Sequence, residues 1–334
     1  MTRLVRLACC LAAATVAACG GGSTGSTAII AIDGSSTVFP ISEAVAVEFQ
    51  RANPSARVTV SESGTGGGFQ KFCRGETVIA DASRPITQTE IDACAAAGIA
   101  YVELPVAYDG LAVVVNPKNT WVDAITVAEL KRLWEPAAQN TITRWNQLRA
   151  DWPDEEFNLY GPGTASGTFD YFTEAIVGEA QASRGDYTPS EDDNVLVLGI
   201  AGDQHALGYF GLAYYEQNQD KLRVVPVDDA DPTNGEGPIA PSFETVRDGT
   251  YRPLSRPLFV YVNAAALDSR PEVQQFMEFY MQLDAGLIRD VGYVPLADVE
   301  QDLVRQRLAD RTTGTMFTGV SQTDSLESIL RGQR

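Results

Sequence analysis

Apolar residues recur along the chain in two alternating patterns, short runs rich in β-branched residues and longer stretches with helical spacing. Residues 29–32 and 57–60 are typical of strands, and residues 41–51 are typical of an amphipathic helix. A second helix is expected to open at residues 69–73. Strands that alternate with helices along a chain predict an α/β fold.

Two continuous apolar runs, residues 111–115 and 258–262, suit strands buried on both faces. The block between them, from about residue 126 to about residue 246, has helices and strands of its own. We therefore predict two lobes, with the chain crossing between them twice. The predicted boundaries are 29–108 plus 259–310 for lobe one, 109–258 for lobe two, and 311–334 for a peripheral tail with a short helix at 325–331. The alternative is two sequential domains divided near residue 150.

The N-terminal residues indicate export. Arg3 and Arg6 precede an uncharged stretch of apolar and small residues that is too short to span a bilayer, which predicts a signal peptide over residues 1–18. The residues before Cys19 resemble the bacterial lipobox, which implies a lipidated (palmitate-bearing) Cys19 and a flexible tether over residues 19–28. The protein would then be held at the extracytoplasmic or periplasmic face of a bacterial membrane. An ordinary secretory signal with a chance cysteine is the alternative.

Two cysteines belong to the folded part, Cys73 and Cys94. An exported protein meets an oxidising compartment, which favours a disulfide between them. Two buried free thiols are the alternative, because the sequence does not give their separation.

Composition excludes several classes of function. A formal net charge of −19 argues against nucleic acid and anionic lipid surfaces as partners. His205 is the one histidine, and no nucleophile, phosphate-loop or metal-ligand motif frames a catalytic centre. We therefore expect no enzyme, no metal and no cofactor, with a phosphate-ester hydrolase as the rival class. We also expect a monomer.

Three segments share one design, an extended run followed by a turn rich in Gly, Ser and Thr and then a helix. They are residues 33–40 (DGSSTVFP), 62–69 (ESGTGGGF) and 161–169 (GPGTASGTF). The start of a helix carries unpaired N–H donors and about half a positive charge, so an oxyanion is a suitable ligand there. One such segment is usually an ordinary helix cap. Three of them facing one cleft would surround a small anion with neutral donors.

As an ordered set, these segments and residues 82–85 (ASRP) resemble the motifs of Pst-type phosphate-binding proteins. The resemblance covers about residues 29–300. It implies a two-lobed type II periplasmic-binding-protein fold with two crossover strands at the hinge, high-affinity binding of inorganic phosphate, and delivery to the permease of an ABC importer. The phosphate-binding residues that we expect are Ser36, Thr37, Val38, Thr65, Ser83, Arg84, Asp109, Ser166, Gly167 and Thr168.

The chain departs from the family pattern at two places. Arg84 stands where the family has the aspartate that accepts the phosphate proton, and Pro162 stands where it has an arginine. We expect Arg84 to supply the guanidinium instead, with a surface ion pair as its alternative role. Asp109, placed just before a crossover strand, is the expected proton acceptor unless it is only a turn residue.

The acceptor has further candidates, and so has the ligand. Asp81 and Glu62 are alternatives to Asp109 as the proton acceptor. The two departures leave room for another oxyanion, namely sulfate, molybdate or a phosphonate. A lipid-anchored sensor or adhesion protein that reuses the fold is a further possibility.

Overall fold

The computed structural model describes residues 29–332 apart from residues 165, 191, 234, 283 and 321–323. The predicted signal peptide, Cys19 and the tether lie outside the described residues. No helix in the described part of the chain has the length and apolar character needed to cross a membrane.

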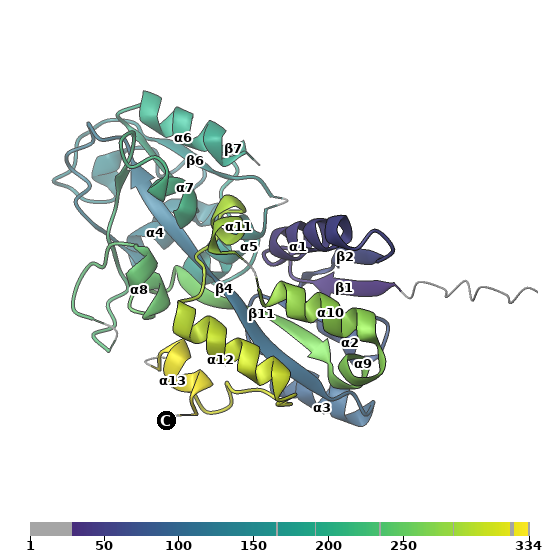
Figure 1. Ribbon diagram of the computed structural model, residues 1–334. Helices are drawn as coiled ribbons and strands as arrows, with labels where there is room; N and C mark the ends of the chain where they lie inside the picture. Colours follow the sequence, from purple (N-terminus) through teal and green to yellow (C-terminus); the bar gives the residue numbers. More distant parts are fainter. Residues whose placement is uncertain are drawn as a thin grey trace, which may run out of the picture.

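Lobe one is a sheet covered by helices on both faces (Figure 1). Its strands run in the order β2-β1-β3-β11-β4, with the first three parallel and β11 antiparallel to both β3 and β4. One face packs on α1, α9, α10 and α12, and the other on α2 and α3. The elements are β1 (Ile30–Gly34), α1 (Phe39–Ala52), β2 (Val58–Glu62), α2 (Gly64–Cys73), β3 (Ile79–Ala82), α3 (Gln88–Ala96), β4 (Tyr101–Val115), β11 (Ser255–Asn263), α9 (Ala264–Ser269), α10 (Pro271–Tyr280) and α12 (Asp298–Ala309).

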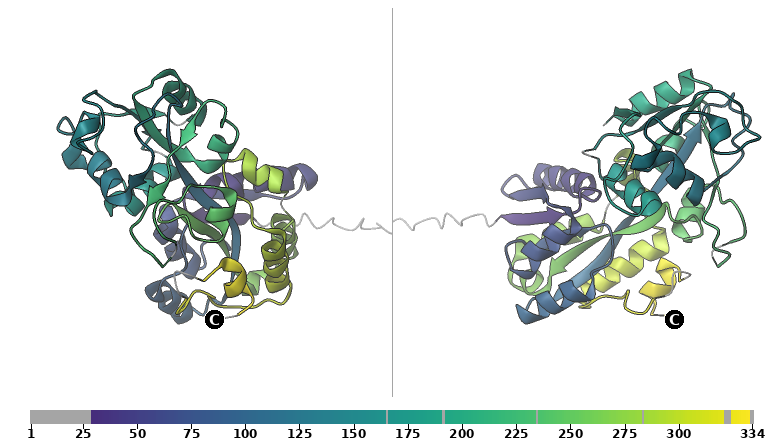
Figure 2. Two further views of the ribbon diagram at one scale, coloured as in Figure 1. Left: turned by 90° about the vertical axis from the view of Figure 1, so that its left-hand side faces the viewer. Right: turned by 180° about the vertical axis from the view of Figure 1, so that it is seen from behind.

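Strand β4 joins the two lobes. Every one of its 15 residues is buried. Its first part pairs with β11 in lobe one, and Leu111–Val115 pairs with β8 in lobe two. The views in Figures 1 and 2 show this strand running from one lobe into the other. The predicted two-lobed α/β fold with crossing strands at the hinge is therefore confirmed.

Lobe two continues the sheet beyond β4 in the order β8-β6-β7, and helices pack around it. Its core is rich in aromatic residues, and Trp134, Tyr209 and Phe172 are fully buried against one another. Its elements are β5 (Ile125–Thr126), α4 (Val127–Trp134), η1 (Pro136–Ala138), η2 (Trp145–Gln147), β6 (Asn158–Pro162), α5 (Gly167–Phe172), η3 (Thr173–Val177), β7 (Thr188–Ser190), α6 (Asp193–Gly202), β8 (Ala206–Gly211), α7 (Leu212–Glu216), β9 (Arg223–Val224), β10 (Val227–Asp228) and α8 (Phe243–Arg247).

The C-terminal segment packs against the hinge. It contains α11 (Ala285–Asp290), α12 and α13 (Leu326–Leu330), which begins one residue after the predicted start at Ser325. The Tyr108 hydroxyl on β4 donates to the Glu300 carboxylate on α12 at 2.6 Å. The buried Glu103 carboxylate, also on β4, accepts from the Thr315 hydroxyl at 2.7 Å and from the Met316 N–H at 2.8 Å.

Helix α2 begins earlier than predicted. The expected glycine-rich turn at residues 64–68 is itself the first turn of the helix. A side chain at Gly68 would come within 2.5 Å of the Gly34 Cα, so glycine lets α2 lie directly on the end of β1. This close approach brings the starts of α1 and α2 to one place.

Candidate functional site

A cavity of about 220 Å³ lies between the lobes where the starts of α1 and α2 meet. Three hydroxyl-bearing residues at these helix starts, Ser36, Thr37 and Thr65, line it, together with Ser83 after β3. We call these four residues the hydroxyl cage. The structure thus brings together residues from three separate segments that the sequence analysis selected.

The loop before α1 uses part of its hydrogen-bonding capacity internally. The Thr37 N–H donates to the Ser35 hydroxyl oxygen at 3.2 Å, and the Val38 N–H donates to the Ser35 carbonyl at 3.2 Å. Val38 is fully buried and does not line the cavity. Ser36 and Thr37 line the cavity together with Ser35, whose hydroxyl oxygen is already engaged by the Thr37 N–H.

The Thr65 and Ser83 hydroxyls lie 3.1 Å apart, and the Ser83 N–H donates to the Thr65 oxygen at 3.2 Å. Behind this pair, the buried Asp33 carboxylate accepts from the Ser63 hydroxyl and from Lys71 Nζ, the latter at 2.5 Å. Lys71 offsets the charge of Asp33, so that carboxylate adds little negative potential to the cage.

Lobe two meets the cage at the start of α5. The Ser166 hydroxyl caps this helix by accepting from the Thr168 N–H at 3.2 Å. The Thr37 hydroxyl donates to the Gly167 carbonyl at 3.4 Å across the gap between the lobes. A side chain at Gly167 would come within 2.7 Å of the Thr37 nitrogen, so glycine permits this contact. Residues 166–168 border the cage, whereas the described lining from lobe two comes from Asp170, Tyr171, Glu174 and Ala180.

Arg256 on β11 is a functional candidate that the sequence analysis missed. Its Nη2 donates to the Thr37 hydroxyl at 3.2 Å, and its guanidinium lies 3.6 Å from the centre of the Tyr171 ring. Both Nε and Nη2 donate to Asp109 Oδ2, each at 3.4 Å. Burial raises the pKa of the Asp109 carboxyl, and the charge of Arg256 opposes this shift. Asp109 therefore lies behind Arg256, and Arg256 itself lines the cavity.

A sequence signal for Arg256 exists. It comes two residues before the apolar run 258–262, as Asp109 comes two residues before the run 111–115. Antiparallel pairing of β4 with β11 places these two charged residues directly opposite one another. Without that pairing, nothing in the sequence connects them.

Arg84 lines the cavity, yet its guanidinium is engaged elsewhere. Its two terminal nitrogens donate to the two Glu90 carboxylate oxygens at 2.9 and 2.8 Å. The same Glu90 side chain caps α3 through Thr87. Burial alone would raise the pKa of Glu90, but the hydrogen bonds from Arg84 and Thr87 lower it. The ion pair considered as the alternative role for Arg84 is thus present.

Two carboxylates face the cavity from lobe two. Asp170 and Glu174 both line it, and Asp170 Oδ1 is buried without a hydrogen-bond partner among the described residues. Burial raises the pKa of Asp170, a hydrogen bond from Gln181 and the charge of Arg256 oppose this shift, and the charge of Glu174 adds to it. The alternatives from the sequence do not line the cavity, since Asp81 is buried within β3 and Glu62 is exposed at the end of β2.

The predicted disulfide between Cys73 and Cys94 is present and joins the end of α2 to α3. It ties the helix that carries Thr65 to the helix that carries Glu90. The described residues contain no group of three or more His, Cys, Asp and Glu side chains placed to hold a metal ion.

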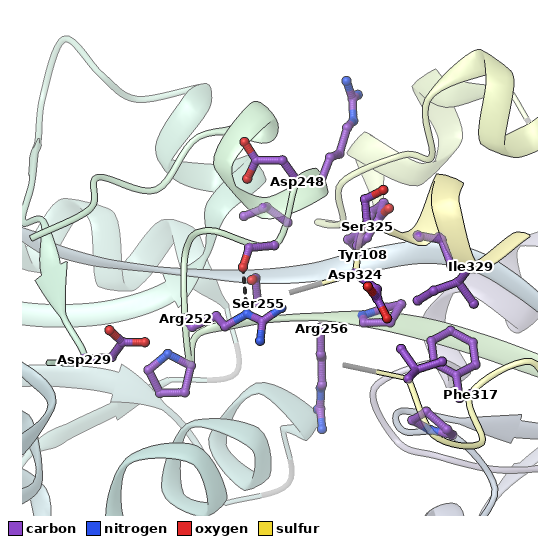
Figure 3. A pocket seen from close by; sticks show the side chains of 18 residues that line it. Tyr108, Asp229, Asp248, Arg252, Ser255, Arg256, Phe317, Asp324, Ser325 and Ile329 are labelled. Carbon is purple, nitrogen blue, oxygen red and sulfur yellow. Dashed lines mark hydrogen bonds between the residues drawn. The ribbon is translucent and has the colours of Figure 1, made fainter. Parts of the chain in front are cut away.

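A larger cavity, about 650 Å³, lies on the other side of the hinge strands. Figure 3 shows Asp248 and Arg252 on one side of it and Phe317 and Ile329 on the other. The Arg256 side chain points out of this cavity (Figure 3). Its lining has none of the cage hydroxyls, so the cavity between the lobes is the better candidate site.

Two α/β lobes, joined by crossing strands and holding hydroxyl and guanidinium donors between them, define a type II periplasmic-binding-protein fold. The chain belongs to the PBP superfamily, whose domain matches residues 21–282.

Relatives span nearly the whole chain. Protein SphX of Synechocystis sp. is 49% identical over 95% of this chain and 93% of its own length. The phosphate-binding protein PstS of Staphylococcus saprophyticus is 36% identical over 88% of this chain and 89% of its own. The crystal structure of a possible phosphate-binding protein from Planctomyces limnophilus is 47% identical, with a TM-score of 0.80, and covers 85% of this chain and 98% of that one.

Proposed function

We propose that this protein binds inorganic phosphate in the cavity between its lobes and delivers it to the permease of an ABC importer. The observation that carries the proposal is the convergence of the hydroxyl cage with the Arg256 guanidinium at the point where the lobes touch. The relatives named as phosphate-binding proteins support the same ligand. The protein is a binding protein and not an enzyme.

The chemistry of the cavity suits a tetrahedral oxyanion. The cage supplies hydroxyl donors from lobe one, and Arg256 supplies a charged donor from the hinge. Hydrogen bonds to charged groups contribute about 1.5–3 kcal/mol each. Several of them, less desolvation and the cost of closing the lobes, suffice for the ~8 kcal/mol of micromolar binding. At physiological ionic strength the Debye length is about 8 Å, so distant surface carboxylates weaken this binding little.

We propose Arg256 as the principal guanidinium for phosphate, with Arg84 at the rim of the site. Arg256 already donates to a cage hydroxyl and is held against the Tyr171 ring. Arg84 would have to leave Glu90, or share its donors with that residue, to bind the anion. The remaining expected ligands, Val38 and residues 166–168, do not line the cavity. We propose that they position the loops that border the cage.

Asp170 is our preferred acceptor for the proton of monohydrogen phosphate, ahead of Asp109. It lines the cavity and has a buried carboxylate oxygen without a partner among the described residues. Asp109 instead holds Arg256 in place. Monohydrogen phosphate can donate its proton to such a carboxylate oxygen, whereas fully ionised sulfate has no proton to donate and its oxygen would be repelled, so the acceptor favours phosphate over sulfate.

Calorimetry on the purified, ligand-free protein tests the proposal. Phosphate at pH 7 should bind tightly and sulfate weakly. If neither anion releases heat or displaces the other, the phosphate function is wrong while the fold remains as described.

We also propose that the protein is exported and anchored through a lipidated Cys19, with residues 1–18 as the signal and 19–28 as the tether. The resemblance of the residues before Cys19 to a lipobox and the composition of the tether support this. Cys19→Ser should move the protein from the membrane fraction to the soluble fraction. Unchanged membrane association would contradict the anchor.

We propose residues 29–108 plus 259–310 as lobe one, residues 109–258 as lobe two and residues 311–334 as the C-terminal tail. Closure of the lobes around the two crossing strands would be the signal of a loaded protein. We propose that the protein acts as a monomer.

A further inference from the structure

A second hollow, about 250 Å³, opens directly from the cavity that contains the hydroxyl cage. The two share Ser83, Arg84, Tyr171, Glu174 and Arg256 as a common rim. Beyond this rim the hollow is lined by three apolar residues, Pro85, Ala175 and Pro257, and the two prolines also line the cavity of about 650 Å³. We call it the apolar hollow. The cage supplies donors for anion oxygens, whereas these three side chains have nothing to offer a charged oxygen.

The hollow coexists with contact between the lobes. Thr37 donates to the Gly167 carbonyl at 3.4 Å, and there is no room for even a methyl group on Gly167 beside Thr37. The lobes therefore cannot approach more closely at the cage. The hollow, on the far side of Arg84 and Arg256 from that contact, is present in the same arrangement. A phosphoryl group in the cage would thus have one side facing an apolar space.

The charges at the rim limit what can occupy this space. Glu174 contributes a carboxylate from lobe two, Arg84 is paired with Glu90, and Arg256 is paired with Asp109 and donates to Thr37 of the cage. A second anionic group on the ligand would meet the Glu174 carboxylate at the rim. A short uncharged hydrocarbon group would instead contact two rigid proline rings and the Ala175 methyl.

We propose that the cavity also binds short alkylphosphonates, with the phosphonate oxygens in the hydroxyl cage and the alkyl group in the apolar hollow. This inference rests on the proposed phosphate function of the same site. It gives the ligand class as inorganic phosphate or a phosphonate whose single P–C bond carries an alkyl chain of one to three carbons. Each methylene buried in the hollow should improve affinity by about fourfold, up to the length that the hollow accommodates.

The test is calorimetric titration of the purified, ligand-free full chain with inorganic phosphate, methylphosphonate, propylphosphonate and phosphonoacetate. We expect the first three to bind, propylphosphonate more tightly than methylphosphonate, and phosphonoacetate at least tenfold more weakly than propylphosphonate. Phosphate binding without either alkylphosphonate would overturn the inference and leave the proposed function intact. Alkylphosphonate binding without phosphate would support the hollow and contradict the proposed function, and no binding of any ligand would overturn both.

A variant separates the hollow from the cage. Ala175→Phe should fill the hollow, lower propylphosphonate affinity at least tenfold and leave phosphate affinity unchanged. Ala175→Leu is the milder version, and Ala93→Phe, on the exposed face of α3, is the matched control. Equal loss of phosphate and propylphosphonate binding in folded Ala175→Leu, verified by circular dichroism, would show that the hollow is no separate subsite.

Discussion

Asp109 and Arg256 face each other on the two neighbouring strands of the hinge, and Asp109 Oδ2 accepts from both Nε and Nη2 of Arg256 at 3.4 Å. Asp109 is almost completely buried, whereas the Arg256 guanidinium reaches the cavity. The pair therefore places a positive charge at the junction of the lobes and holds it from behind. The pair lies on β4 and β11, which are hydrogen-bonded to each other at the hinge. This pairing holds the Arg256 guanidinium where the lobes meet.

The first prediction concerns the two arginines. Arg256→Gln removes a charged donor from the cage, and we expect phosphate affinity to fall about 10- to 100-fold, in line with about 1.5–3 kcal/mol for such a bond. Arg84→Gln should cost less, because the Arg84 guanidinium is already bound by Glu90. Calorimetry on both variants measures the difference. A large loss in Arg84→Gln with none in Arg256→Gln would return the principal role to Arg84.

The second prediction concerns the contact between the lobes. Gly167→Ala places a methyl group within 2.7 Å of the Thr37 nitrogen, which should push the lobes apart at the cage. Overpacking of this kind costs about 1–3 kcal/mol, or about 5- to 100-fold in phosphate affinity. Small-angle scattering with and without phosphate should show a smaller compaction. Gly202→Ala, where the added methyl meets open space, is the control and should behave as wild type.

A third experiment separates the carboxylates. Asp170→Asn should erode the preference for phosphate over sulfate, because the acceptor of the phosphate proton is replaced by a group that can also donate. Asp109→Asn should lower the affinity for both anions together, because it weakens the hydrogen bonds that hold Arg256 in place. Competition titrations with the two anions measure this. Loss of discrimination in Asp109→Asn alone would make Asp109 the acceptor.

A fourth prediction links Asp81 to the pH dependence of stability. Burial raises the pKa of Asp81 to about 8, against a hydrogen bond from Ser42 and with a further rise from the charge of Asp33. The folded protein therefore holds a proton that the unfolded chain releases near its ordinary pKa of 3.8. The contribution of Asp81 to the free energy of unfolding is complete below pH 3.8 and is lost as pH rises to about 8. The loss is at most about 1.4 kcal/mol per pH unit.

Asp81→Asn should abolish this dependence while retaining an acceptor for the Ser42 hydroxyl, which donates to Asp81 Oδ1 at 2.9 Å. Urea unfolding between pH 4 and pH 8.5 should show the variant gaining stability relative to wild type as pH rises. Asp220→Asn, at an exposed position, serves as the control. Parallel pH profiles for wild type and Asp81→Asn would contradict the assignment.

Local hydrophobic patterns predicted many of the helices and strands. The apolar run at residues 258–262 and the helix at residues 41–51 lie within β11 and α1 as expected, because periodicity reports which face of an element is buried. The start of α2 was missed. Glycines usually indicate a turn, so residues 64–68 were predicted as a turn. In the structure they form the first turn of α2, which packs through Gly68 on Gly34.

By itself, the sequence determined the α/β class and the hydroxyl-rich segments before helices, because each depends on residues near one another in the chain. It also predicted the two crossing strands and the Cys73–Cys94 disulfide, with two sequential domains and free thiols as the alternatives. Only the tertiary structure decided which charges serve the cavity. Arg256 and Asp109 are 147 residues apart in the chain and meet through strand pairing. Arg84 is close to the cavity but is engaged by Glu90, and Asp170 faces the cavity from the opposite lobe. Charge placement depends on which distant elements pack together, and the pattern along one segment does not contain that information.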